Sequence, residues 1–127
     1  MLNEKNKYLG YANLLIHSFA VAHAAVVALF SYFNLPDEVP LTILTVLMII
    51  LVVRLYKFPY DLSAVLSLMF CFGGFFLGTK GGELMSNHTT GFWHDYANVI
   101  VTFLVTEMVG WVAYLIAKNL HIKQSDN

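Results

Sequence analysis

Long apolar stretches separated by short polar segments dominate the chain. Four such blocks cover about residues 11–33, 41–56, 62–84 and 96–117. An apolar run of about 18 residues or more is typical of a transmembrane helix. A lipid bilayer provides no partners for backbone N–H and C=O groups, so these segments are expected to be helical. The pattern predicts an all-α polytopic membrane protein, with residues 1–127 forming one compact bundle of four transmembrane helices.

The polar breaks between the blocks contain residues that end or begin helices. Pro36, Asp37 and Pro40 separate the first two blocks, and Pro40 suits an early helical position. Pro59 precedes the third block, where Asp61 is predicted to be the N-cap. The polar run at residues 86–91 predicts a loop before the last block. The second block is short, so we expect it to cross the bilayer upright or to thin it slightly.

Basic residues predict how the helices are oriented. If four spans alternate, all the lysines and arginines except Lys80 fall on the side of the two termini. Cytoplasmic segments of membrane proteins are enriched in these residues, so both termini are predicted to be cytoplasmic. The residues on that side are Lys5, Lys7, Arg54, Lys57, Lys118 and Lys123.

Composition supports the membrane assignment and excludes several classes of protein. Of the 127 residues, 58% are hydrophobic and only 12% are charged, which excludes an ordinary soluble enzyme and a disordered tail. Cys71 is the single cysteine, so an internal disulfide scaffold is excluded as well. The net charge of −1 argues against a nucleic-acid partner, which needs a basic surface. Membrane lipid is the expected surrounding.

Small and weakly polar residues form a stripe along the third block. They recur at steps of three and four residues, which places them on one face of a helix. Such a stripe lets another helix approach closely, either within one chain or between subunits of an oligomer. Lining of a pore is the remaining interpretation. The stripe consists of Ser63, Ser67, Cys71, Gly74, Gly78 and Gly81.

The first block carries a second face of this kind, whose residues are polar near the start of the block and mostly small toward its end. His23 points about a third of a turn away from His17, so the two do not form a metal-binding pair on one helix face. A metal site in the last connection would require Glu83, His88, His94 and Asp95 to be gathered by chance, so no metal and no other cofactor is expected. The face consists of Asn13, His17, Ala20, Ala24, Ala28 and Ser31.

Glu107 is the residue that points most strongly to a function. It lies near the middle of the fourth block, where a carboxylate is unfavourable unless it is paired, hydrated or protonated. His23, at a comparable depth, is its expected partner, and His17 is also within reach. Glu107 is interpreted either as part of an ion or proton path or as a hydrogen-bonding group between helices. Asn98 lies on the opposite side of the same helix, so one narrow pore cannot easily expose both.

Several elements of the chain resemble the YcjF-like family, a small membrane domain also found at the C-terminus of bacterial GTP-binding proteins. They are the His- and Ala-rich segment from His17 to Ala28, the Pro36-Asp37 turn, Met48-Ile49, and the glycines Gly74 and Gly78. Asn98 and the Thr-Glu-x-x-Gly-Trp element at residues 106–111 complete the resemblance. It implies a compact module of the bacterial inner membrane that works beside a GTPase. It implies no catalytic residue.

Three classes of function remain open. The leading interpretation is a small, homo-oligomeric membrane protein that forms or contributes to a pore for ions or small solutes. The alternative is a non-catalytic anchor or sensor for a soluble cytoplasmic partner such as a GTPase. A membrane enzyme is the third class, but the sequence contains no phosphate-binding loop, nucleophile elbow or pair of carboxylates at membrane depth.

Overall fold

The computed structural model of the protein describes residues 4–88 and 92–126. It contains the helices α1 (Glu4–Tyr32), α2 (Glu38–Arg54), α3 (Tyr60–His88) and α4 (Phe92–Ser125), and the other described residues lie in connections between them or at the C-terminal end. The prediction of an all-helical chain is confirmed.

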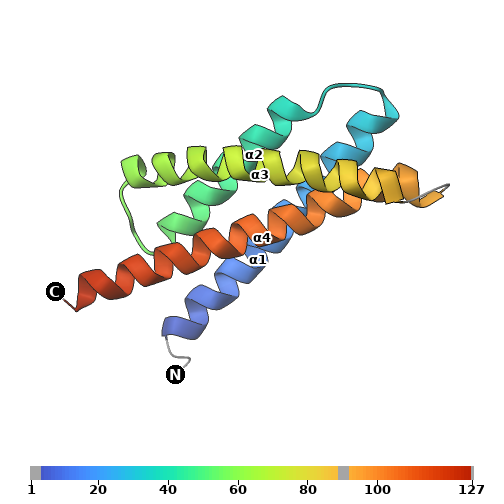
Figure 1. Ribbon diagram of the computed structural model, residues 1–127. Helices are drawn as coiled ribbons and strands as arrows, with labels where there is room; N and C mark the ends of the chain where they lie inside the picture. The colour runs from blue at the N-terminus through green and yellow to red at the C-terminus, as the bar shows by residue number, and fades with distance from the viewer. Residues whose placement is uncertain (1–3, 89–91, 127) are drawn as a thin grey trace.

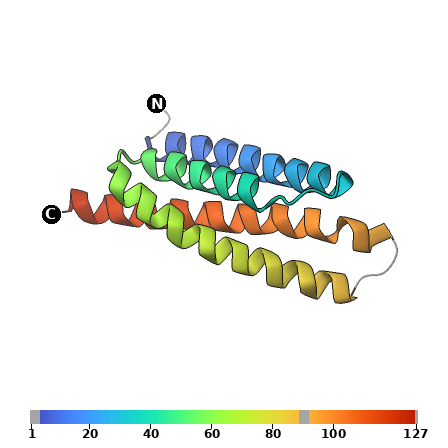
Figure 2. The ribbon, with the colours of Figure 1, turned by 90° about the horizontal axis from the view of Figure 1, so that it is seen from above.

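The four helices form two hairpins that pack against each other. Figures 1 and 2 show α1 beside α2 and α3 beside α4, with both chain ends and the α2–α3 connection at one end of the bundle. We call this the terminal end, and the opposite end, with the α1–α2 and α3–α4 connections, the loop end. In Figure 2, α2 and α3 lie together near the terminal end and diverge toward the loop end. This divergence creates the space described below.

Three of the helices are long and apolar enough to cross a membrane. The suitable segments are Asn6–Tyr32, Asp61–Met85 and Tyr96–Ser125, whereas α2 has 17 residues and is shorter. Large apolar side chains are exposed on every helix, for example Leu14 at 68%, Val39 at 70% and Phe72 at 77%. Apolar surface of this extent is the surface that lipid covers, so the fold indicates a membrane protein.

Local sequence explains where the helices end. Asn34 adopts the left-handed conformation (φ 53°), which asparagine tolerates, and the N–H of Leu35 donates to Phe30 O over 2.9 Å in a Schellman-type termination of α1. The predicted N-cap Asp61 is wrong, because α3 already begins at Tyr60 and Asp61 lies inside its first turn. There its negative charge still favours the helix N-terminus. The loop predicted at residues 86–91 is also shorter than expected, since α3 continues to His88.

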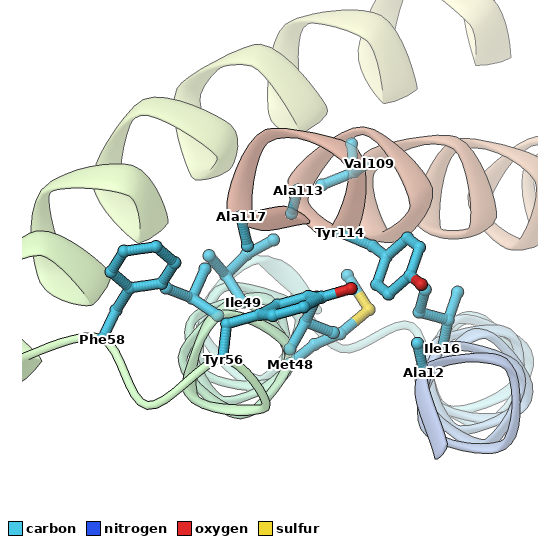
Figure 3. Close-up of a cluster of buried hydrophobic side chains, with 12 residues drawn as sticks. Ala12, Ile16, Met48, Ile49, Tyr56, Phe58, Val109, Ala113, Tyr114 and Ala117 are labelled. Atoms are coloured by element: carbon cyan, nitrogen blue, oxygen red, sulfur yellow. The ribbon is translucent and has the colours of Figure 1, made fainter. Parts of the chain in front are cut away.

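The core lies in the half of the bundle nearer the terminal end. Figure 3 shows Tyr114 of α4 extending toward Ile16 and Ala12 of α1, with Met48 of α2 beside it. Ile16 and Met48 are completely buried, as are most of the other members of this cluster. Gly110 permits the approach of α1 to α4, because a Cβ there would lie 2.8 Å from Ile16 Cγ2. The four helices are therefore in tight apolar contact at this end.

Candidate functional site

A cavity of about 340 Å³, lined by both polar and apolar residues, lies between the two hairpins where they diverge. All four helices line it. It extends from Asp37 and Glu38 at the loop end to His23, which lies nine residues before the end of α1 or about 14 Å along the helix. Its polar side chains, besides these, include those of Thr42, Thr45, Thr79, Asn98, Thr102 and Thr106. A cavity of this size and polarity has room and hydrogen-bonding groups for several water molecules.

Small residues of α3 keep this space open. A Cβ at Gly78 would meet no atom within 4 Å, and one at Gly74 would make only an ordinary contact of 3.5 Å with Val109. Asn98 of α4 packs tightly against α3 at the loop end, since a Cβ at Gly82 would lie 2.8 Å from its Oδ1. The chain is thus closely packed at the edge of the cavity and open beside Gly78.

His23 is the buried group at the inner end of the cavity, with 3% of its surface exposed. Its Nδ1 lies 2.7 Å from the carbonyl oxygen of Phe19, and its Nε2 lies 3.0 Å from Thr45 Oγ1. A carbonyl oxygen can only accept, so Nδ1 carries a hydrogen and donates it to Phe19. The tautomer of the neutral ring therefore leaves the lone pair on Nε2, facing Thr45.

The hydroxyl of Thr45 lies between two hydrogen-bonding groups. Its Oγ1 is 3.0 Å from His23 Nε2 and 2.9 Å from the carbonyl oxygen of Leu41, and it has one hydrogen to donate. With neutral His23 the hydroxyl donates to Nε2. With protonated His23 the ring donates to Oγ1 and the hydroxyl turns to Leu41. Both protonation states of His23 are therefore hydrogen-bonded, and rotation of one hydroxyl exchanges them.

Glu107 belongs to a second polar site, on the side of α4 that faces α1. Its Oε1 lies 2.7 Å from His17 Nδ1, and its Oε2 accepts a hydrogen bond of 3.1 Å from Trp111 Nε1. Oε1 is buried, and within the described chain the His17 ring is its only close polar neighbour, although that contact is not aligned as a hydrogen bond.

The expected partnership of Glu107 with His23 is wrong. The register of α1 against α4 places Ile16 at Gly110, and this brings His17 beside Glu107. His23 lies six residues further along α1, faces α2 and bonds to Thr45. The two histidines therefore belong to different sites. The Glu107 side chain is only 16% exposed, so it faces protein, whereas the His17 side chain is 60% exposed.

The other predicted residues are divided between the contacts and the cavity. On α3, Ser63 and Ser67 are buried and donate to carbonyl oxygens one turn earlier, while Cys71, Gly74 and Gly78 line the cavity. A Cβ at Gly81 would lie 3.0 Å from Val101, which makes Gly81 a close helix contact.

Two predicted polar residues lie apart from one another. Asn98 lines the cavity, on the opposite side of α4 from Glu107, as the helical spacing requires. Asn13 is exposed on α1. The side chains of His94 and Asp95, considered above as metal ligands, lie outside the described residues.

Sequence reasoning missed the threonines. Thr42 and Thr45 lie three residues apart in α2, and Thr102 and Thr106 lie four apart in α4, so each pair shares one helix face. Pairs of hydroxyl residues at this spacing in two apolar blocks were the available signal that these faces meet around a polar space.

Replacing Glu107 tests how much the second site stabilises the fold. Glu107→Leu leaves His17 Nδ1 and the Trp111 N–H without their partner, and we expect a loss of about 1 kcal/mol in the free energy of unfolding. Glu107→Gln retains an acceptor for Trp111 and should remain near the wild type. Thermal unfolding in detergent, followed by tryptophan fluorescence, measures both. Equal stability of the Leu variant and the wild type would show that the carboxyl group has no structural role.

Comparison of the chain with protein-family models, curated proteins and solved structures gave no match. The resemblance to the YcjF-like family therefore stays a prediction that rests on the sequence elements given above.

Proposed function

We propose that the protein is a four-span integral membrane protein that provides a path for small ions or polar solutes, and that the proton is the ion its geometry fits best. The observation that carries this proposal is the polar cavity that ends on His23. The ring lies at membrane depth between hydrogen-bond partners that suit both of its protonation states. Ionisable groups inside a membrane are unfavourable and typically mark ion or proton pathways.

The charges and hydroxyl groups of the cavity support a cationic permeant. Asp37 and Glu38 line its loop end, where their negative charge raises the local concentration of cations. Hydroxyl groups such as those of Thr42 and Thr102 offer oxygen atoms that replace part of the hydration shell of an ion. Imidazole can bind and release a proton at a ring nitrogen, and both ring nitrogens of His23 already have hydrogen-bond partners, which makes His23 the suitable carrier of a proton.

The path is closed beyond His23. Met48 forms part of the cavity wall, and Ile49, Val52 and Val53 of α2 are completely buried between the cavity and the terminal end. Transfer through the protein therefore requires the hairpins to shift relative to each other, as in carriers with alternating access. We expect a slow flux rather than the rate of an open channel.

In the topology that we propose, α2 is the fourth span and both termini are cytoplasmic. The α2 helix lies alongside α1 and α3 in Figure 2, and its 17 residues extend about 26 Å, close to the thickness of the hydrocarbon layer. Lys7 near the start of α1, Arg54 at the end of α2, Lys57 in the α2–α3 connection and Lys123 near the end of α4 all lie toward the terminal end, which fits a cytoplasmic side. The cavity then opens toward the outer face of what we take to be a bacterial inner membrane.

The proposal is tested by proton flux into liposomes that contain the purified protein. A potassium gradient with valinomycin sets the membrane potential, and a pH-sensitive dye inside the vesicles reports proton entry. We expect flux above that of protein-free vesicles, and none above that background would contradict the proposed function.

A further inference from the structure

One face of α1 remains uncovered by the rest of the chain although it carries polar groups at membrane depth. His17 is at the centre of this face, and its Nε2 has no partner among the described residues. Asn13, one turn earlier, is exposed and has no hydrogen-bond partner in the described chain either. Lipid tails cannot bond to an imidazole or an amide, so leaving both in contact with lipid is unfavourable. A further protein surface is needed to satisfy them.

The remaining residues of this face are small. At 100° per residue, Gly10, Ala24 and Ala28 lie within about 20° of His17, and Asn13 lies about 40° away. Gly10 and Ala28 are exposed, Ala24 is half-buried, and a Cβ at Gly10 would meet no atom within 4 Å. A face with a polar centre and small residues toward both ends allows another helix to approach closely along its whole length.

We propose that this face, formed by Gly10, Asn13, His17, Ala24 and Ala28, is the contact surface between two copies of the chain in the membrane. Copies inserted in the same direction are related by a twofold axis along the membrane normal, which brings equal depths of the two α1 helices together. Small residues then face small residues, and polar groups face polar groups.

The donors and acceptors of the face complement themselves across such an axis. Because Nδ1 of His17 is directed at Glu107, its Nε2 is left to bond outward. When Nδ1 carries the hydrogen, Nε2 accepts, and the amide of Asn13 supplies N–H donors four residues, or about 6 Å, away along the helix. Each His17 can thus accept from Asn13 of the second copy, in two symmetric bonds. The polar site of one chain is incomplete without the other copy.

Disulfide cross-linking in native membranes tests the proposal. In a Cys71→Ser background, Gly10→Cys and Ala28→Cys place cysteines near the two ends of the face. Leu68→Cys is the control, since Leu68 is 59% exposed on α3, and α3 makes no contact with α1 in the described chain. Leu68 lies eight residues after the start of α3, much as Gly10 lies six residues after the start of α1. Disulfides require Cβ atoms about 4 Å apart. We expect oxidation to give covalent dimers from the two α1 variants and monomers from the control.

Several outcomes overturn the proposal. Dimers from Leu68→Cys alone would place the contact on another face, and cross-links only to a different protein would identify another occupant. Monomers throughout would leave the face without a second copy. Because flux is measured separately, dimers without flux contradict only the proposed function, and flux without dimers contradicts only this inference.

A second measurement examines the hydrogen bonds. Asn13→Val removes two symmetric bonds per dimer, and on the average strength of such bonds in membranes we expect the dissociation constant in detergent to rise about eightfold. Ser18→Val is the matched control, because the Ser18 hydroxyl lies off this face and donates within its own helix to Leu14 O. An unchanged dissociation constant for Asn13→Val would contradict the assigned contact.

Discussion

His23→Leu should abolish proton flux through liposomes that contain the protein. Leucine has a similar volume but cannot bind a proton, and the contacts of the ring with Phe19 and Thr45 disappear with it. No other imidazole lines the cavity among the described residues, so no second group of this kind replaces it. We expect a loss of at least tenfold, because the variant removes the one imidazole that lines the described cavity. Flux equal to that of the wild type would remove His23 from the pathway.

Variants of Thr45 distinguish a proton relay from a merely polar cavity. Thr45→Ser keeps the hydroxyl that lies between His23 Nε2 and Leu41 O, so its flux should remain close to the wild type. Thr45→Val has nearly the same shape but leaves Nε2 without a partner when the ring is neutral. We expect proton flux to fall in the Thr45→Val variant and not in Thr45→Ser. Equal effects of Ser and Val would mean that packing, and not the hydroxyl, matters at this position.

Gly110→Leu should cause the largest loss of stability among the glycine variants. Even the first carbon of a side chain at this position would lie 2.8 Å from Cγ2 and 2.9 Å from Cγ1 of Ile16. Ile16 is β-branched and completely buried, so it has no room to turn away. The α1 and α4 helices must then separate, and we expect a loss of about 3 kcal/mol or more, seen as a lowered unfolding temperature in detergent.

Gly78→Leu provides the matched control for this prediction. Gly78 is also a helix-interior glycine, but the space around it is open and belongs to the cavity. We expect the fold to remain stable while the leucine side chain fills part of the cavity and reduces flux. If Gly78→Leu lowers the unfolding temperature as much as Gly110→Leu, the distinction between a close contact and an open cavity is wrong.

The apolar pattern was sufficient to predict the helices, because lipid-facing and core-facing residues are both apolar and make each span a continuous block. The ends were less predictable. The α4 helix continues through Lys118 and Lys123 to Ser125, since a helix can extend into water with polar residues. Asp61 is of a residue type that is common at N-caps, but α3 begins one residue earlier, at Tyr60.

The site was less predictable, because sequence spacing describes one helix at a time. Counting residues places Glu107 and both histidines within the apolar blocks, but it contains no information about which helix each face meets. His17 and His23 are six residues apart and point in directions that differ by about 120°, toward α4 and α2. The choice between them depends on the register of α1 against α4, which the contact of Ile16 with Gly110 sets.

Water access to Cys71 tests the central claim most directly. Cys71 is the single cysteine of the chain and lines the cavity, with its Sγ 4.0 Å from Thr42 O. Thiols react as thiolates in water, so a thiol in lipid stays unmodified by a charged, membrane-impermeant methanethiosulfonate reagent. We expect the reagent to modify Cys71 when it is added at the loop end of oriented vesicles and not when it is added at the terminal end. Modification from the terminal end, or from neither end until the protein is unfolded, would contradict a polar cavity that opens to one side of the membrane.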